Sequence, residues 1–170
     1  MSLPEWRVTP IERSHNRSAF DCGDADLNDY LRRYARQNHD SGGAKCFIAT
    51  SEPASDHVLG FYTLSPASID YARTPATARK GLGRYDVPAF RLGRLAIDLP
   101  MQGRGLGGAL LLNAAQRCLR AAQEVGGVAL LIDAKHARAA KWYESYGATA
   151  LLDAPLSLVL PLATFARALR

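Results

Sequence analysis

The sequence predicts one α/β or α+β domain over residues 1–170, in which a single layer of sheet is flanked by helices. Two observations lead to this prediction. Apolar residues recur at helical spacing in two segments, and short apolar runs bounded by turn residues lie around them. The resulting order is strand, helix, strands, helix, strand, helix, strand. A chain of 170 residues is long enough for one domain to bury most of its apolar surface.

The first helix is predicted from five apolar residues that share one face. Asp24 or Asp26 can cap its start, and the segment 38–43, which ends in two glycines, stops it. Its outward face carries three arginines, whose role need be no more than to keep the protein soluble. The apolar stripe comprises Leu27, Tyr30, Leu31, Tyr34 and Ala35, and the outward arginines are Arg32, Arg33 and Arg36.

Six short runs are predicted as strands because they are rich in apolar residues and end at turn residues. Helices are expected from Gly105 to Glu124 and from about His136 to Tyr146, and a turn over 51–56. The segment from Arg73 to Pro88 is rich in Gly, Pro and Arg, and we expect a long loop there. The predicted strands are Trp6–Val8, Cys46–Thr50, Val58–Leu64, Phe90–Asp98, Val128–Ile132 and Leu156–Leu160.

Composition favours a soluble globular protein, since 48% of the residues are hydrophobic and 22% are charged. No apolar run approaches the ~20 residues of a membrane helix, and the N-terminus does not resemble a signal peptide. We therefore expect a cytoplasmic protein without membrane association. The three cysteines lie far apart, and neither they nor the histidines have metal-ligand spacing. Reduced, mostly buried thiols and no metal site are expected.

The net charge of +5 is concentrated in one segment. Between Arg73 and Arg104 there are seven basic residues and two acidic ones, so the remainder of the chain is neutral. Such a basic segment can attract phosphates, either of a cofactor or of a nucleic acid, and a solvated loop is the alternative. The basic residues are Arg73, Arg79, Lys80, Arg84, Arg91, Arg94 and Arg104.

A glycine-rich turn between a strand and a long helix is the clearest chemical motif. Glycines there let N–H groups point into one concavity, and the helix start adds partial positive charge, which suits a pyrophosphate. Gly103, Gly105 and Gly108, with Asp133 further on, also imitate a dinucleotide-binding fingerprint. That alternative is disfavoured because four residues separate the strand from the first glycine. The chain after Asp133 is also too short to complete such a fold.

The run Gln-Gly-Arg-Gly-Leu-Gly at 102–107 resembles the Q/R-x-x-G-x-G/A motif of GCN5-related N-acetyltransferases (GNATs). The run Trp-Tyr-Glu-Ser-Tyr-Gly at 142–147 resembles the late helix of that family. The resemblance implies a mixed, mostly antiparallel twisted sheet and acetyl-CoA as co-substrate. It also implies that Tyr143 is the general acid. Tyr146 is the second choice for this role, and the alternative for Tyr143 is that it is an ordinary core aromatic. It assigns the pantetheine arm to the backbone of Leu95, Ala96 and Ile97, and the pyrophosphate to Gln102, Gly103, Arg104, Gly105, Leu106, Gly107 and Gly108.

Further segments resemble the toxin branch of this family, from type II toxin–antitoxin modules. Those toxins are paired with ribbon-helix-helix antitoxins and acetylate the α-amino group of aminoacyl-tRNA, which blocks translation. The basic segment suits a tRNA backbone, and we expect Arg84, Arg91 and Arg94 to contact it. The segments that carry the resemblance are Phe20–Gly23, Asp29–Leu31, Gly60–Ser65, Arg84–Pro88, Arg91–Asp98 and Asp133–Lys135.

The sequence departs from the family pattern at Ala148, where Phe is usual, and at Gly93, where the toxins often have Ala. Neither change removes a catalytic atom, and no carboxylate or histidine stands out as a general base. Similar toxins often dimerise, and Leu156–Val159, expected on an edge strand, would contribute to a homodimer. The alternatives are an acetyltransferase of a small amine or protein amine, and a non-catalytic module that binds CoA or RNA.

Overall fold

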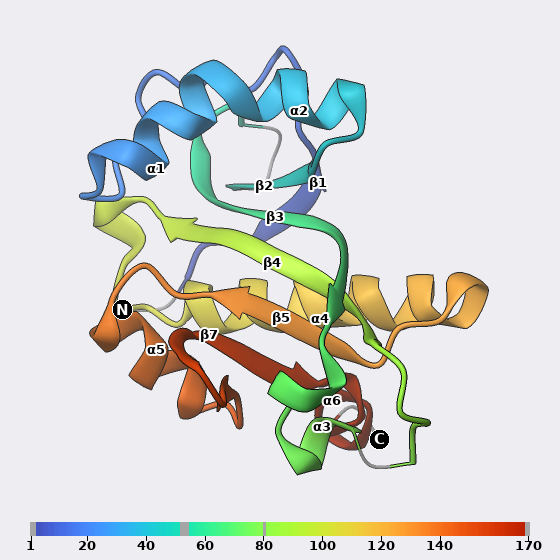
Figure 1. The fold of residues 1–170 in the computed structure, drawn as a ribbon. Helices are drawn as coiled ribbons and strands as arrows, with labels where there is room; N and C mark the ends of the chain where they lie inside the picture. The colour runs from blue at the N-terminus through green and yellow to red at the C-terminus, as the bar shows by residue number, and fades with distance from the viewer. Residues whose placement is uncertain (1–2, 52–54, 80, 169–170) are drawn as a thin grey trace. The chain divides into compact units, whose positions relative to one another are not determined.

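The computed structural model describes residues 3–51, 55–79 and 81–168 (Figure 1). Lys80 of the basic segment and the centre of the predicted turn at 51–56 lie outside these residues. The chain forms two compact units, one of Met1–Ser65 with Arg94–Leu112 and the other of Pro66–Gly93 with Asn113–Arg170. Among the described residues, no helix has both the length and the apolar character needed to cross a membrane.

In the part of the chain that the structure describes, seven strands are hydrogen-bonded in the order β1-β2-β3-β4-β5-β7-β6. Pairing is antiparallel for β1–β2, β2–β3, β5–β7 and β6–β7, and parallel for β4–β5. The predicted mixed, mostly antiparallel sheet is therefore confirmed. The strands are β1 (Trp6–Pro10), β2 (Lys45–Ser51), β3 (Val58–Ile69), β4 (Val87–Ile97), β5 (Ala129–Asp133), β6 (Thr149–Leu151) and β7 (Ala154–Pro161).

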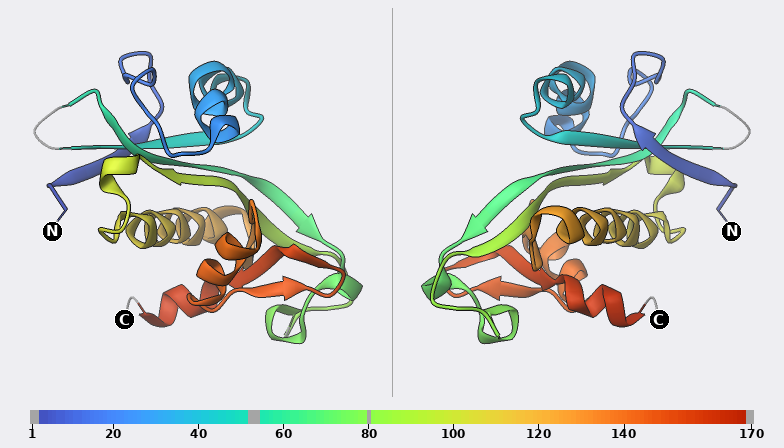
Figure 2. Two further views of the ribbon diagram at one scale, coloured as in Figure 1. Left: turned by 90° about the vertical axis from the view of Figure 1, so that its left-hand side faces the viewer. Right: turned by 90° about the vertical axis from the view of Figure 1, so that its right-hand side faces the viewer.

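One helical run covers a face of β1, β2 and the start of β3 in the first unit (Figure 2). It comprises α1 (Ala25–Asp29), the π-helical segment η1 (Tyr30–Tyr34) and α2 (Ala35–Ser41). The Asp24 side chain accepts hydrogen bonds from two N–H groups of the first turn, which confirms this residue as the cap. Gly42, with φ of 84°, ends the run.

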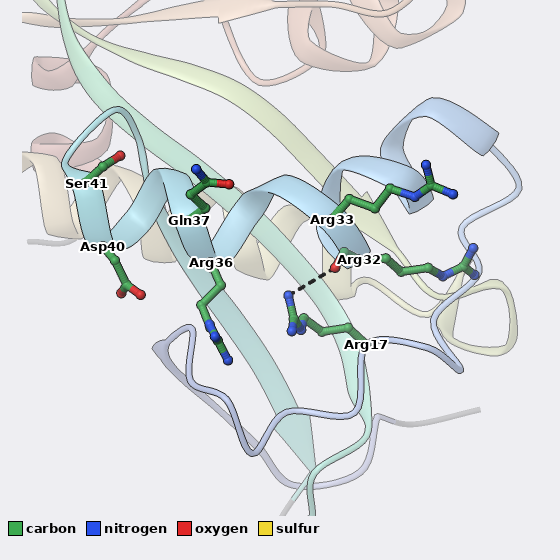
Figure 3. A pocket seen from close by; sticks show the side chains of 7 residues that line it. All are labelled: Arg17, Arg32, Arg33, Arg36, Gln37, Asp40 and Ser41. Atoms are coloured by element: carbon green, nitrogen blue, oxygen red, sulfur yellow. Dashed lines mark hydrogen bonds between the residues drawn. The ribbon is translucent and has the colours of Figure 1, made fainter.

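The π-helical segment corrects one sequence-based expectation. Tyr30, Leu31 and Ala35 are buried as predicted, but the side chain of Tyr34 is 52% exposed. A π-helix bonds residues i and i+5 instead of i and i+4, so it shifts the apolar stripe relative to a regular helix. The buried side of the run packs on Phe20 and Phe61, whose rings meet edge to face at 5.6 Å. Its outward arginines surround a concavity, shown in Figure 3.

The second unit contains β5, β6 and β7 with α5 (Ala137–Glu144) and α6 (Leu162–Ala168). Strand β7 pairs with β5 on one side and with β6 on the other. The expectation that Leu156–Val159 forms an edge strand is therefore wrong. Strand β6, which pairs with β7 on that side, has only three residues and is too short to be recognised from its sequence pattern. Helix α6 was also not predicted.

The segment Arg73–Pro88 is not one long loop. It contains the end of the short 3-10 helix η2 (Tyr71–Arg73) and the short helix α3 (Ala76–Arg79), and β4 already begins at Val87. By contrast, the long helix α4 (Leu106–Val125) begins and ends within one residue of its predicted bounds. Helix α4 and strands β3 and β4 each pass from one unit into the other.

Candidate functional site

The glycine turn at the start of α4 has the geometry of an anion cradle. Gly103 and Gly105 adopt φ of +74° and +88°, and apart from the adjoining residues no described atom lies within 4 Å of the position that a Cβ would take at either residue. The N–H of Ala109 donates to the carbonyl of Gly105 at 3.2 Å. The N–H groups of the first turn, at 106–108, precede this bond and have no acceptor within the helix. The turn therefore presents amides and a helix's positive end to open space, which suits a pyrophosphate.

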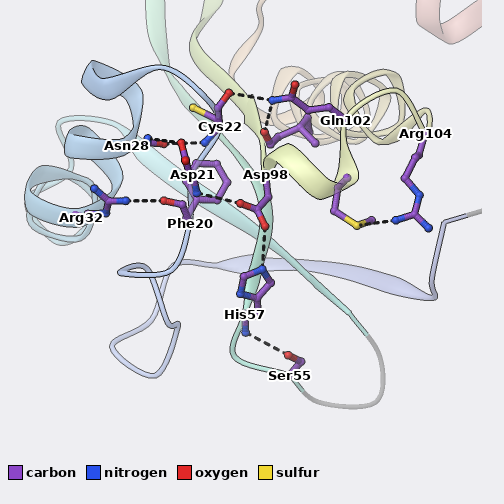
Figure 4. Close-up of polar contacts among 12 residues, drawn as sticks. Phe20, Asp21, Cys22, Asn28, Arg32, Ser55, His57, Asp98, Gln102 and Arg104 are labelled. Atoms are coloured by element: carbon purple, nitrogen blue, oxygen red, sulfur yellow. Dashed lines mark hydrogen bonds and ion pairs between the residues drawn. The ribbon is translucent and has the colours of Figure 1, made fainter.

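Gln102 holds this turn in place. Its side-chain Nε2 donates to the carbonyl of Ile97 at 2.8 Å and to that of Cys22 at 2.9 Å (Figure 4). Its own N–H donates to the carbonyl of Leu99 within the 3-10 turn η3 (Leu99–Met101). The side chain of Gln102 is thus engaged with backbone acceptors, so the structure gives it a positioning role beside the cradle.

A buried carboxylate, Asp98, anchors the end of β4 in the first unit. Its Oδ1 accepts from the N–H of Asp21 at 2.9 Å, and its Oδ2 lies 2.9 Å from Nε2 of His57 (Figure 4). The backbone agrees with this arrangement, because Leu99 N–H donates to the carbonyl of Asp21 at 2.8 Å. The loop before α1 is therefore fastened to the strand that leads into the glycine turn.

The same loop is closed by Asp21 and Asn28. Asp21 Oδ1 accepts from the N–H of Gly23 and from Nδ2 of Asn28, both at 2.9 Å. These two bonds lower the pKa of the Asp21 carboxyl. Asn28 Oδ1 in turn accepts from the N–H of Cys22, whose carbonyl receives Gln102. Sequence reasoning missed this network because its links to Asp98 and Gln102 join parts of the chain that are 77 and 80 residues apart.

The backbone of Leu95, Ala96 and Ile97 forms the last part of β4. The parallel pairing with β5 joins Ala89–Leu92 to Ala129–Ile132, so these three residues lie beyond the part of β4 that pairs with β5. A Cβ at Gly60 of β3 would stand 2.9 Å from the carbonyl oxygen of Ala96. Only glycine fits there, and its absence of a side chain allows β3 to approach this end of β4 closely.

Tyr143 lies on α5 in the second unit, where His136 caps the helix by accepting from the N–H of Ala139 at 3.1 Å. The tyrosine is buried, and its hydroxyl makes no hydrogen bond with any residue that the structure describes. Burial raises the pKa of the Tyr143 phenol well above its ordinary value, and the negative charge of Asp133 raises it further. The phenol therefore keeps its proton at neutral pH. Tyr146, the second choice for the acid, is 41% exposed.

The three arginines expected to contact RNA differ in their surroundings. Arg84 is exposed. Arg91 Nη1 donates to Oδ2 of Asp133 at 2.7 Å, and the guanidinium of Arg94 lies 3.5 Å from the ring centroid of Tyr30. Two of the three are thus engaged by other side chains. A second group of arginines, around the concavity of Figure 3, is instead gathered at one place.

The cysteines do not form a nucleophilic site. Cys46 and Cys118 are buried, and burial raises the pKa of each thiol to about 12. Burial also raises the pKa of Cys22, which is half-buried. Thiols with raised pKa values stay protonated at neutral pH and are poor nucleophiles. Within the described ranges, no three histidine, cysteine or acidic residues gather as metal ligands would.

Solved structures place this fold in one class. A tyrosine-to-phenylalanine mutant of KacT superposes with a TM-score of 0.89 and 26% identity, over 96% of this chain and 99% of that one. AtaT complexed with acetyl-methionyl-tRNAfMet also gives a TM-score of 0.89, at 25% identity over 98% and 100%. Together with the glycine turn at the start of α4, these likenesses define an acetyltransferase with the GNAT fold.

Proteins of similar sequence show which group of GNAT acetyltransferases the chain belongs to. The chain is 39% identical over 150 residues to the tRNA-acetylating toxin of Mycobacterium tuberculosis, which covers 88% of each chain. It is 29% identical over 166 residues to the probable toxin TacT of Sinorhizobium fredii, covering 92% of this chain and 91% of the relative. No protein-family model matches. The chain belongs to the GNAT-type tRNA-acetylating toxins of toxin–antitoxin systems, as the sequence motifs implied.

Proposed function

We propose that this chain transfers the acetyl group of acetyl-CoA to the α-amino group of aminoacyl-tRNA and so blocks translation. The observation that carries the proposal is the open glycine turn at the start of α4, in a chain 39% identical to a tRNA-acetylating toxin. Two relatives at 25% identity support it: AtaT was solved with acetyl-methionyl-tRNAfMet, and AtaTR with acetyl-CoA.

In this proposal the first unit binds the co-substrate. The amides of the turn from Gly103 to Gly108, including those of Arg104, Leu106 and Gly107, hold the pyrophosphate, and Gln102 keeps the turn in position. The backbone of Leu95, Ala96 and Ile97 hydrogen-bonds the amides of the pantetheine arm. Acetyl-CoA fits the turn because the space beside Gly103 and Gly105 is open and the helix end is positive.

Tyr143 serves as the general acid. The neutral amine attacks the thioester carbonyl and forms a tetrahedral intermediate. The carbon–sulfur bond then breaks and the departing sulfur takes the phenolic proton, while the proton that the attacking nitrogen loses passes to the phenolate, directly or through water, and restores Tyr143. The raised pKa of Tyr143 ensures that this proton is present at neutral pH. The acceptor needs no strong base from the protein, because the α-amino group of an aminoacyl ester is a weak base and is partly neutral near pH 7.

The partners follow the family. AtaT, which is 25% identical in sequence to this chain, was solved bound to the C-terminus of the antitoxin AtaR. KacTA, with 26% sequence identity, was solved in a complex with DNA. We infer that this chain pairs with an antitoxin of the ribbon-helix-helix type and works in the cytoplasm, where charged tRNA is found. Dimerisation stays a prediction, and it does not rest on β7, which is inside the sheet.

Transfer of radiolabelled acetyl groups to bulk tRNA tests the proposed function. We expect label on charged tRNA and none on deacylated tRNA, because only charged tRNA carries the α-amino group. Mild alkali should release the label as N-acetylamino acid, since it cleaves the aminoacyl ester. Label that appears equally on deacylated tRNA, or only on a small amine or a protein, would contradict the proposal.

A further inference from the structure

The first unit carries a concave, positively charged surface that the sequence motifs do not include. Its volume is about 630 Å³, and it faces outward from the helical run formed by η1 and α2 (Figure 3). Four arginines and a single carboxylate line it, so its charge is strongly positive. We refer to it as the arginine surface; its residues are Arg17, Arg32, Arg33, Arg36, Gln37, Asp40 and Ser41.

Two of these guanidinium groups are held in place by backbone carbonyls. Arg17 Nη1 donates to the carbonyls of Leu31 and Arg32, both at 3.3 Å, and Arg32 Nη2 donates to the carbonyl of Phe20 at 2.7 Å. The carbonyls that receive Arg17 belong to the π-helical segment, and such segments are frequent at functional sites. The bonds fix the positions of the two charges without neutralising them, because a carbonyl carries no net charge.

The other two arginines are available to a ligand. Arg33 pairs with Asp29 at 2.9 Å, but its side chain is 72% exposed, and an exposed ion pair of this kind contributes little energy. Arg36 makes no hydrogen bond or ion pair with the described part of the chain. Arg91, whose side chain is less exposed than that of Arg33, pairs with Asp133, and Arg94 lies over the ring of Tyr30.

The lining indicates the chemical class of the ligand. Small-molecule pockets and grooves for amphipathic helices are lined mainly by apolar side chains, whereas all seven residues here are polar or charged. A guanidinium group is planar and binds two oxygens of a phosphate at once. Several arginines side by side match a ligand with repeated phosphates.

We propose that the arginine surface binds phosphodiester groups of the tRNA substrate. This inference rests on the proposed function, in which tRNA is the acceptor. It places backbone contacts on Arg17, Arg32, Arg33 and Arg36, outside the basic segment 73–104. Nucleic-acid phosphates release counterions when arginines neutralise them, so binding through this surface depends steeply on salt.

Equilibrium binding of bulk tRNA over a series of KCl concentrations tests this inference without requiring activity. Arg33→Gln with Arg36→Gln removes the two arginines that are not bound to backbone carbonyls, so the fold should survive, which thermal unfolding verifies. We expect affinity to fall by at least tenfold at low salt. The slope of log K against log[KCl] should become shallower by roughly 1.4 to 1.8, about 0.7 to 0.9 for each lost phosphate contact.

Arg120→Gln is the control, because Arg120 is an exposed arginine of α4 that is not among the residues of this surface. Its tRNA affinity and salt slope should equal those of the wild type. The inference is overturned if the double variant keeps the wild-type slope, or if Arg120→Gln changes it as much. It is also overturned if the double variant binds tRNA normally but loses its antitoxin, since the surface would then bind an acidic protein segment.

Acetyl transfer to charged tRNA, measured in parallel, separates this inference from the proposed function. A wild-type protein that binds tRNA through these arginines but transfers no acetyl group would contradict the function and leave the surface assigned. If the wild-type protein acetylates charged tRNA and the double variant is unchanged in both tRNA binding and acetyl transfer, the result contradicts the role of the arginine surface. It does not contradict the proposed function.

Discussion

His57 Nε2 lies 2.9 Å from Oδ2 of Asp98, although 41 residues separate the two in sequence. The carboxylate is buried, and its other oxygen accepts from the N–H of Asp21. Asp98 thus joins three segments: the start of β3, the end of β4 and the loop before α1. Because β4 leads into the glycine turn, this contact helps to fix the position of that turn.

Replacing Asp98 with alanine should destabilise the protein by about 1–3 kcal/mol, because it removes the buried carboxylate that accepts from the N–H of Asp21 and contacts His57. Urea unfolding measures this. Asp153→Ala is the control: it breaks the exposed ion pair with Arg73, which we expect to be worth less than about 1 kcal/mol. Equal losses in the two variants would show that the buried network does not stabilise the fold.

Gly105→Ala should weaken acetyl-CoA binding by at least tenfold. Alanine is strained at φ of +88°, and its Cβ would enter the space in which we place the pyrophosphate. Gly126→Ala is a matched control, because Gly126 has φ of +84° and equally open surroundings at the far end of α4. Calorimetric titration should find a reduced affinity in the first variant alone. Normal binding by Gly105→Ala would exclude the turn as the pyrophosphate site.

Stability should fall in alkali, in part through Cys118. Burial raises the pKa of its thiol from an ordinary value of 9.0 to about 12 in the folded state. The folded form therefore binds the proton more tightly, and the resulting stability is complete below pH 9 and lost as the pH rises toward 12. The loss is about 1.4 kcal/mol per pH unit for each such thiol.

Cys118→Ala should show a smaller decrease than the wild type between about pH 8 and about pH 10, by on the order of 1 kcal/mol. Urea unfolding under reducing conditions at the two pH values measures this difference. Cys46 contributes equally to both proteins, because its thiol is unchanged in the variant. Identical pH dependence in the two proteins would mean that the Cys118 thiol does not titrate differently on unfolding.

Local sequence signals predicted the position of the glycine turn and of the helix after it. Glycines at 103 and 105 precede a 20-residue helix, and the structure shows positive φ at both, with open space beside them. Helix α5 with Tyr143 was likewise visible from its sequence. The roles of these residues in binding and catalysis remain predictions, as does the folding of residues 1–170 as one domain.

Contacts between distant segments were not predictable. Nothing local to His57 or Asp21 indicates that both meet Asp98, because those contacts depend on how β3, β4 and the loop before α1 are brought together. The same reason applies to the contacts of Arg91 with Asp133 and of Arg94 with Tyr30, while the assignment of these two arginines to RNA stays a prediction. Which side chain a residue contacts depends on the tertiary structure, whereas the backbone freedom of a glycine is a property of the residue itself.

The central claim, acetyl transfer to aminoacyl-tRNA with Tyr143 as proton donor, is tested most directly by the single-turnover rate of Tyr143→Phe on charged tRNA. We predict a fall of about 10²- to 10⁴-fold, the usual contribution of a general acid, with unchanged affinity for acetyl-CoA. Tyr146→Phe, which alters an exposed hydroxyl, should retain the wild-type rate. A Tyr143→Phe protein that acetylates charged tRNA at the wild-type rate would contradict the account.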